Sequence, residues 1–387
     1  MLEKLYRQLG IHYTCDETVL GRLRSLVDEF FEQCAYKRRL TSFNELRREK
    51  AILRHSPLAA DWLVICALMD EAEDGGGEDA LSILFQCQDY LDRRQRGWYL
   101  LARSYHGDPD SVEYAREAVS LLQNSFSRVA LLYAYYEDGE YRNVLTESEQ
   151  TASQALQEGN LWVLAECYNL RGTVYACFNM EDMMLTEYKR AARLLSETLW
   201  QSSLRMIFYN IGATYLGLER FEEAETYLEK AGGRSDTDSG RNTAETEDEK
   251  DDLSTQYSLF HKLALLHCRT GRAEQAAAEL EAMKNLLSEM EKQSGSRQTS
   301  DSGERNRWET RRRIWELTAL ELSGRTDSSE YLSQLEELME IFRKRRMYGY
   351  MMFYHHQLRS LYTGRRQYRK AYLLEQMFSD IQRNSSL

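Results

Sequence analysis

The chain has 387 residues, 62 acidic against 50 basic side chains, and a formal net charge of −12. This balance argues against a general binder of nucleic acid or other polyanions, because phosphate contacts need a net basic surface or a broad basic stripe. The seven cysteines include no C-x2-C pair and mostly lie in apolar stretches, which favours reduced, buried thiols over a disulfide set or a zinc site.

Helix-forming residues dominate the composition. Only two prolines occur, and leucine, glutamate, alanine and arginine are abundant while β-branched runs are rare, so we expect an all-α chain without a sheet. The N-terminal stretch MLEKLYRQLGIHYT has no apolar signal region. The longest apolar run, 62–69, is far shorter than the roughly 20 residues that span a bilayer. These features predict a cytoplasmic protein that does not enter a membrane.

The first residues predict helices that follow no repeat. Asp16 is placed to cap a helix whose apolar spacing continues to about Leu40, and Thr41 or Ser42 begins another. We interpret residues 1–57 as an irregular helical N-terminal cap.

From residue 58 onward, a helical hairpin recurs about every 40 residues. Its clearest copy is 204–231. Gly212 on a first helix faces Ala224 on a second, and the residues around them follow the spacing of two patterns, W-x2-L-G-x2-Y and A-x3-F-x2-A. The small residue lets the two helix backbones pack closely. One such hairpin cannot bury its own apolar stripe and must stack on neighbours. The pattern therefore predicts about eight hairpins over 58–384, arranged as a right-handed α-α superhelix.

Two polar segments interrupt the repeats. Residues 232–252 and 293–307 are rich in Gly, Ser and charged side chains and almost lack apolar residues, so burial cannot offset the entropy of ordering them. We predict two disordered insertions. The first holds a cluster of acidic residues whose role the sequence does not reveal.

Sequence signatures of catalysis are missing. The chain has no H-E-x-x-H, P-loop, G-x-G-x-x-G or G-x-S-x-G motif. His355 and His356 project to different faces of one helix, and the basic runs 311–313 and 343–346 spread around theirs. No helix-turn-helix precedes the repeats. We expect no enzyme activity, no cofactor, no metal and no direct binding of nucleic acid.

The predicted superhelix leaves one candidate site, its concave face. First helices line that face, and the residues beside the signature positions point into it. The mixture of aromatic, amide and cationic side chains suits an extended peptide or protein segment, which needs both backbone partners and apolar pockets. The candidate binding residues are Tyr99, Arg103, Tyr133, Tyr136, Asn169, Thr173, Tyr209, Asn210, His261 and Gln357, with Val129, Ala213, Lys262 and His356 beside them.

The spacing of these hairpins resembles the tetratricopeptide repeat (TPR) family over about residues 60–380. That resemblance implies binding of peptides or proteins. More narrowly, repeats with long helices behind an irregular N-terminal region look like the Rap, Rgg, PlcR and NprR group of peptide-pheromone receptors. In that group groove asparagines hold the backbone of a short signal peptide, and their counterparts here would be Asn169 and Asn210. The chain departs from the DNA-binding members because it lacks their helix-turn-helix.

Two other functions remain open at this stage. One is a regulatory phosphatase of the Rap kind, in which Gln33 on the long N-terminal helix would promote hydrolysis of a phospho-aspartate on a partner. The other is a scaffold that joins two proteins without a small ligand. The identity of the ligand and the oligomeric state, including a homodimer, are likewise undecided by the sequence.

Overall fold

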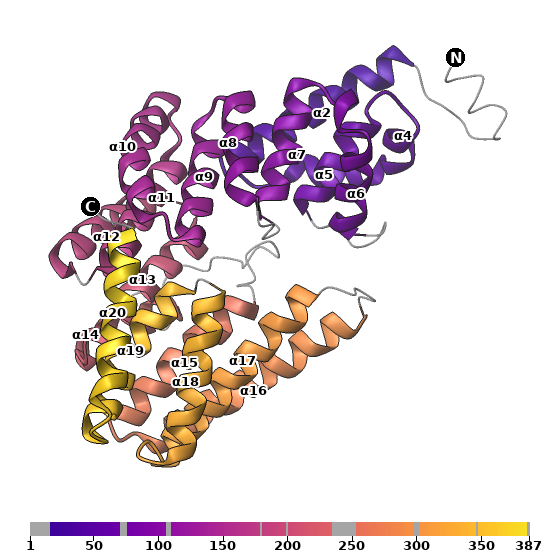
Figure 1. The fold of residues 1–387 in the computed structure, drawn as a ribbon. Coiled ribbons are helices and arrows are strands. Elements are labelled where there is room, and N and C mark those ends of the chain that lie inside the picture. Colours follow the sequence, from indigo (N-terminus) through magenta and orange to yellow (C-terminus); the bar gives the residue numbers. More distant parts are fainter. Residues whose placement is uncertain are drawn as a thin grey trace. The chain divides into compact units, whose positions relative to one another are not determined.

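The regular structure of the chain is helical (Figure 1). The computed structural model describes residues 16–69, 76–105, 110–178, 180–198, 200–233, 253–296, 302–345 and 347–384. Within these ranges no strand occurs, so the all-α prediction is confirmed. The helices form two compact units. Unit 1 comprises 1–138 and 143–167, and unit 2 comprises 139–142 and 168–387.

The chain of unit 1 begins with α2 (Glu17–Ala35), α3 (Thr41–Arg48) and α4 (Lys50–Arg54). Asp16 caps α2 as expected, since its Oδ1 accepts a hydrogen bond from the backbone N–H of Thr18 at 2.8 Å. The helix ends earlier than predicted, because Lys37 has a left-handed φ of 47° that no α-helix continues. The division into cap and repeats stays a prediction.

Pairs of helices complete unit 1. They are α5 (Ala59–Met69) with α6 (Gly76–Gln86), α7 (Arg93–Tyr105) with α8 (Ser111–Leu122), and α9 (Ser125–Asp138) with α10 (Tyr141–Glu158). A short 3-10 helix, η2 (Gln88–Tyr90), precedes α7. A row of aromatic rings joins these layers to α2 and to Trp162. Trp98 stacks on Phe31 with centroids 5.0 Å apart, and Phe126 lies 5.8 Å from Trp98 and 6.0 Å from Trp162.

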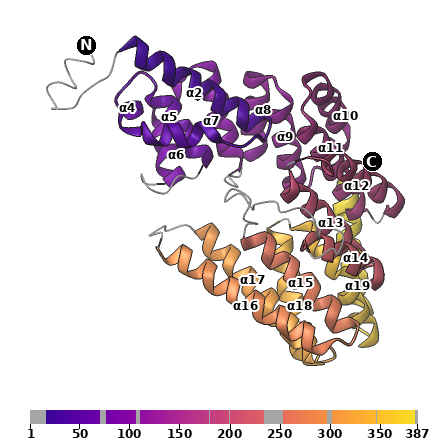
Figure 2. The same ribbon diagram turned by 180° about the vertical axis from the view of Figure 1, so that it is seen from behind.

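Unit 2 continues the same arrangement. α11 (Leu161–Cys177) begins in unit 1, continues into unit 2 from residue 168, and pairs with α12 (Glu181–Leu195). The further pairs of unit 2 are α13 (Gln201–Gly217) with α14 (Phe221–Ala231), α15 (Leu253–Arg269) with α16 (Ala273–Ser296), α17 (Ser302–Leu322) with α18 (Ser329–Lys344), and α19 (Tyr348–Gly364) with α20 (Tyr368–Asn384). Figures 1 and 2 show α15 to α18 running side by side. Because α13 packs on both α15 and α19, the first helices of these hairpins approach one another in the interior of the unit.

Glycines at the predicted small positions lie where helices touch. A Cβ atom on Gly172 would stand 2.7 Å from Tyr188 of α12, and one on Gly212 would stand 2.8 Å from Leu228 of α14. Real Cβ atoms do not approach side chains so closely, so both positions require glycine. The TPR-type hairpin predicted from the sequence is therefore present.

The structure revises one predicted insertion. In 293–307, α16 continues to Ser296 and α17 begins at Ser302, so both ends of the segment are helical. The glutamine, glutamate and arginine residues there are good helix formers, and at the ends of the segment their preference outweighs that of the glycines and serines. Residues 297–301, and residues 234–252 of the first insertion, lie outside the described parts of the chain. Among the helices that are described, none has the length and apolar character needed to cross a bilayer.

Candidate functional site

In unit 1, Arg103 holds the two tyrosines beside it. Its Nη1 donates a hydrogen bond to the Tyr99 hydroxyl at 3.1 Å and its Nη2 to the Tyr114 hydroxyl at 3.0 Å. The guanidinium carbon also lies 4.6 Å from the centroid of the Tyr114 ring. Tyr99 is only 1% exposed. It therefore belongs to the core of the unit and not to the wall of a groove.

Two further candidates lie on α9 in unit 1. The Tyr133 hydroxyl donates a hydrogen bond to the carboxylate of Glu166, which is buried on α11. Tyr136 is half-buried. This contact gives Tyr133 a structural partner, and a binding role for either tyrosine stays a prediction.

The two candidate asparagines of unit 2 meet. Asn210 Nδ2 on α13 donates a hydrogen bond to Asn169 Oδ1 on α11 at 3.2 Å. Asn169 is buried, whereas Asn210 is half-buried. Asn169 therefore orients the Asn210 amide. The carbonyl oxygen of the Asn210 side chain accepts no hydrogen bond from any described residue.

Thr173 faces its partner helix. Its hydroxyl donates to the backbone carbonyl of Asn169 at 2.9 Å and accepts from the Tyr188 hydroxyl of α12 at 3.1 Å. Both contacts belong to packing within the hairpin. These contacts give Thr173 structural partners, and a binding role for this residue stays a prediction.

The Gln33 side chain is also held by hydrogen bonds to its neighbours. Its Nε2 donates to Glu29 at 2.7 Å and to Thr41 at 2.9 Å, while its Oε1 accepts from the backbone N–H and the hydroxyl of Ser42 at 3.3 and 2.7 Å. The side chain is buried and caps the first turn of α3. The structure therefore gives no support to Gln33 as the hydrolytic residue of a phosphatase.

The remaining candidates gather in the interior of unit 2, around α15. His261 is fully buried, and its Nε2 shares a hydrogen bond of 2.8 Å with the Tyr354 hydroxyl of α19. Burial, together with the charges of Lys262 and Arg269, lowers the pKa of His261 well below its ordinary value, so the imidazole is neutral. Its Nδ1 has no hydrogen-bond partner among the described residues. His261 is a buried polar group and not part of an open wall.

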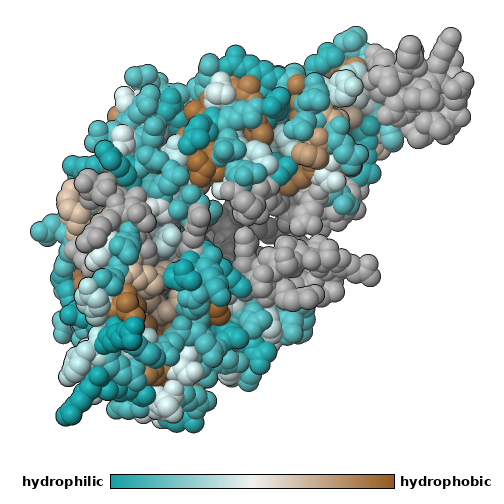
Figure 3. Space-filling view, in the orientation of Figure 1, coloured by the Kyte–Doolittle hydropathy of each residue, from teal (hydrophilic) through white to brown (hydrophobic). Residues whose placement is uncertain are grey.

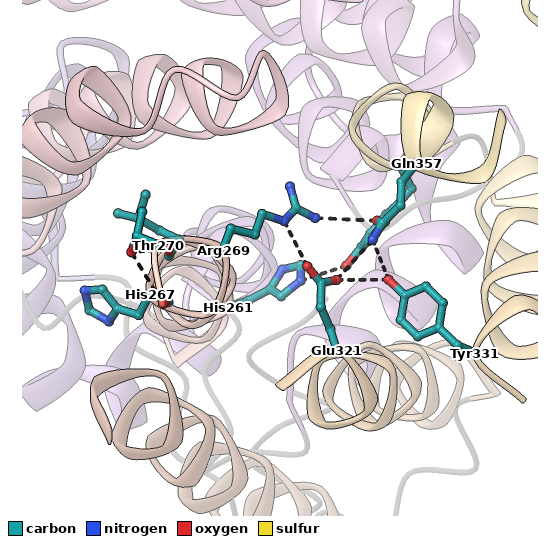
Figure 4. Close-up of polar contacts among 9 residues, drawn as sticks. His261, His267, Arg269, Thr270, Glu321, Tyr331 and Gln357 are labelled. Carbon is teal, nitrogen blue, oxygen red and sulfur yellow. Dashed lines mark hydrogen bonds and ion pairs between the residues drawn. The ribbon is translucent and has the colours of Figure 1, made fainter. Parts of the chain in front are cut away.

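A polar network joins α15, α17, α18 and α19 in that interior (Figure 4). The carboxylate of Glu321 is its centre, accepting from Arg269 Nε and the Tyr331 hydroxyl, both at 2.9 Å, and from Gln357 Nε2 at 3.2 Å. Gln357 Nε2 also lies 2.6 Å from the Tyr331 hydroxyl, and its Oε1 accepts weakly from Arg269 at 3.5 Å. Four helices therefore hold Arg269 in one orientation.

The Lys262 side chain lies in the same interior, and no acidic residue in the described part of the chain pairs with it. Its ammonium nitrogen lies 3.3 Å from the centroid of the Phe353 ring, 5.1 Å from that of Tyr350 and 5.8 Å from that of Tyr354. The residue is 3% exposed. Burial and the charge of Arg269 lower the pKa of Lys262 well below its usual range, while Glu321 opposes this shift. Lys262 is thus a buried amino group packed against aromatic rings, and its surroundings disfavour its charged form.

Tyr209 of α13 joins this group from the opposite side. Its hydroxyl is hydrogen-bonded to Ser258 of α15, and Ser258 in turn contacts the Tyr350 hydroxyl. Tyr209, His261 and Gln357 are therefore brought together by α13, α15 and α19. We call this set of residues the interior cluster of unit 2: Tyr209, Ser258, His261, Lys262, Arg269, Glu321, Tyr331, Tyr350, Phe353, Tyr354 and Gln357.

Sequence reasoning missed several members of the cluster. Glu321 and Arg269 were not selected, although an acidic residue inside the apolar stretch WELTALEL is a usable signal of a buried charge. The aromatic segment YGYMMFYHH on α19 is a second such signal. What the sequence lacks is the information that α19 returns to pack against α13 and α15.

Other features point away from competing sites. No group of His, Cys, Asp and Glu side chains in the described ranges forms a metal-binding arrangement. The face seen in Figure 3 is mostly hydrophilic, with apolar residues in separate small groups. The interior cluster is therefore the candidate that the geometry favours.

Neither a protein-family model nor a curated protein sequence matches the chain. Solved structures do match. A Rap protein complexed with Competence and Sporulation Factor gives a TM-score of 0.66 at 12% identity, covering 94% of this chain and 99% of that one. The apo form of the quorum sensor NprR from B. thuringiensis gives 0.56 at 12% identity, with the same coverage. The chain shares the fold of these two proteins. The apo form of RapI is more distant, with a TM-score of 0.47 at 11% identity. The resemblance inferred from the repeat spacing is thereby confirmed at the level of fold.

Proposed function

We propose that this chain is a non-enzymatic receptor that binds a short peptide in unit 2, between Asn210 and the interior cluster. The peptide would regulate how the receptor acts on other proteins. The fold supports this proposal, since the Rap structure that resembles it was solved with Competence and Sporulation Factor bound.

The single observation that carries the proposal is the amide pair of Asn169 and Asn210. Asn169 is buried and fixes the Asn210 side chain by the hydrogen bond of 3.2 Å. The carbonyl oxygen of that side chain then remains available to accept from a peptide N–H. An oriented amide offers a peptide backbone the donor and acceptor that an extended chain needs. Because the two amides touch, they would address one peptide unit and not two separate points.

Neighbouring residues supply the rest of a peptide site. Tyr209 precedes Asn210 on α13 and contacts Ser258 of α15, which also contacts the Tyr350 hydroxyl of α19. Half-buried aromatic rings beside oriented polar groups are typical of sites that bind peptide side chains. The site would thus combine a backbone contact at Asn210 with apolar surface on α19.

Affinity selection followed by mass spectrometry tests the proposal. The protein is incubated with an equimolar library of random hexapeptides, separated from unbound peptide by gel filtration, and analysed for what it retains. The wild-type protein should retain a subset of sequences, and Asn210→Ala should lose that subset. Asn44→Ala, a change of an exposed asparagine on α3, is the matched control and should bind like wild type. Failure of the folded wild-type protein to retain any peptide would refute the proposal.

A further inference from the structure

The two cations of the interior cluster lie on one face of α15 and converge on one ring. Lys262 and Arg269 are seven residues apart, which is close to two helical turns and places both side chains on the same side of the helix. The Lys262 nitrogen lies 3.3 Å and the Arg269 guanidinium carbon 5.8 Å from the centroid of Phe353. Two positive charges therefore share one small, largely buried space.

The acidic side chains of the cluster do not balance these charges. Glu321 forms an ion pair with Arg269, with 2.9 Å between the nearest oxygen and nitrogen. Lys262 makes neither a hydrogen bond nor an ion pair with any residue that the structure describes, and its side chain is 97% removed from solvent because the residue is 3% exposed. A buried cation without a counter-charge is unfavourable. When Lys262 and Arg269 are both protonated, the cluster therefore carries one positive charge more than Glu321 balances.

Hydrogen-bond donors of both cations remain unused. Arg269 Nε donates a hydrogen bond to Glu321, and its Nη2 donates one to Gln357. Its Nη1 has no hydrogen-bond partner in the described part of the chain. Figure 4 shows one nitrogen of this guanidinium turned away from both partners. The side chain of Arg269 keeps 20% of its surface exposed, so a ligand can reach it from solvent. Lys262 lies deeper, behind the half-buried ring of Phe353.

The number of donors and the excess charge together indicate the chemistry of the ligand. A carboxylate carries one negative charge and two oxygens, which matches one excess charge and two available donor groups. A phosphate carries close to two negative charges, more than the single excess charge of the cluster. The surrounding aromatic rings also favour a small planar group over a bulky one.

We propose that Lys262 and Arg269 bind a carboxylate of the peptide ligand, either its C-terminal carboxylate or an Asp or Glu side chain. The inference rests on the proposed peptide-binding function and specifies which peptides the receptor accepts. The rings of Phe353 and Tyr350 exclude water around the ammonium group, and Glu321 and Gln357 hold the guanidinium in place. A peptide without a carboxylate leaves Lys262 buried and uncompensated.

Three hexapeptide libraries test the proposal. The first has free C-termini and lacks Asp and Glu, the second is C-terminally amidated and contains Asp and Glu, and the third is amidated and lacks both residues. Each is mixed with the wild-type protein, Lys262→Met and Arg269→Gln, and retained peptides are quantified by mass spectrometry. Lys284→Met, which changes an exposed lysine of α16, is the matched control. Melting curves establish that every variant is folded.

The proposal predicts that the wild-type protein retains peptides from the first library, the second or both, at least tenfold more than from the third. The library that is retained identifies the source of the carboxylate. Both site variants should lose this preference, and the control should keep it. Retention of the third library by wild type at the level of the first two would overturn the carboxylate site and leave peptide binding intact. Retention of nothing from any library by folded wild type would overturn the proposed function, and this inference with it.

Discussion

The ammonium nitrogen of Lys262 lies 3.3 Å from the centroid of the Phe353 ring, and no described carboxylate pairs with it. A desolvated cation gains about 2 kcal/mol from an aromatic face. Removing an ammonium group from water costs several kcal/mol even after the protein relaxes. The aromatic contact therefore offsets only part of the cost, and the fold is less stable with this lysine than with an apolar residue of similar shape.

Lys262→Met should stabilise the protein. Methionine fills the space of the lysine stem, its sulfur makes favourable contacts with aromatic rings, and the buried charge disappears. We expect a gain of about 1–3 kcal/mol in the free energy of unfolding at neutral pH. Urea denaturation of wild type and variant, with Lys284→Met as control, measures it. A variant less stable than wild type would show that the ammonium group has a compensating partner.

The stability gap between Lys262→Met and wild type should depend on pH. The pKa of Lys262 lies well below its ordinary value of 10.5 in the folded protein, so between these two pKa values the unfolded chain binds more protons. The stability of wild type then rises with pH through this window, because stability increases wherever the unfolded state binds more protons. The advantage of the methionine variant should be largest below the folded pKa and should shrink toward pH 10.5.

Other groups near Lys262 do not reverse this trend. Those that face it are His261 and Arg269 on α15, Glu321 on α17, and Tyr350 and Tyr354 on α19. Burial raises the pKa of Tyr354, so this hydroxyl stays protonated in the folded protein across the window. Because both proteins contain these groups, their contributions cancel in the difference. A gap that stayed constant with pH would contradict the prediction.

The hairpins were predictable because their signal is local. Gly172 and Gly212 mark close helix contacts through a short pattern of small and aromatic residues, and the structure places both against the second helix of the same hairpin. The end of α2 was missed because the left-handed conformation of Lys37 has no strong sequence signal at a lysine. Local spacing therefore predicts hairpins well and their termini less well.

The site was only partly predictable because it depends on contacts between distant hairpins. Counting along a first helix selected Asn210, Tyr209 and His261, which all lie toward the interior of unit 2. The same counting selected Thr173, whose hydroxyl pairs with Tyr188. It missed Glu321, because no spacing rule says that Arg269 comes near a helix some fifty residues further along the chain.

Gly212→Leu should be much more damaging than Gly217→Ala. A Cβ on Gly212 would lie 2.8 Å from Leu228 Cγ and 3.0 Å from the backbone nitrogen of that residue, so α13 and α14 must move apart. A Cβ on Gly217 would meet Phe353 at 3.5 Å, an ordinary contact. We expect a loss of about 1–3 kcal/mol or more for the first change and under about 1 kcal/mol for the second. Thermal unfolding of both variants measures the difference, and equal effects would refute the alignment of this hairpin.

Glu321→Gln should destabilise the interior cluster. The change removes the counter-charge of Arg269 and one acceptor from both Tyr331 and Gln357. Breaking a buried ion pair costs about 3–5 kcal/mol, and we expect about 2–3 kcal/mol here because the Arg269 side chain is 20% exposed. The double variant Glu321→Gln with Arg269→Gln should recover part of the loss, since the uncompensated charge is gone. Additive losses in urea denaturation would show that the pair is not coupled.

The paired change of Asn169→Ala and Asn210→Ala should weaken peptide binding strongly and cost little stability. The double change removes both partners of the 3.2 Å hydrogen bond between the amides, so neither partner of that bond is left unpaired. Binding of a peptide unit that loses its contact with Asn210 in a desolvated site is weakened by about 1–3 kcal/mol, or roughly tenfold to a hundredfold in affinity.

The single variants distinguish the roles of the two asparagines. Asn210→Ala should lose this contact outright, whereas Asn169→Ala should lower affinity less, because Asn169 only orients its neighbour. Calorimetric titration with a hexapeptide retained by the wild-type protein, beside a melting curve of the same preparation, measures both quantities. Unchanged affinity in the double variant would remove the amide pair from the binding site, and a large drop in melting temperature with normal affinity would make it a structural contact.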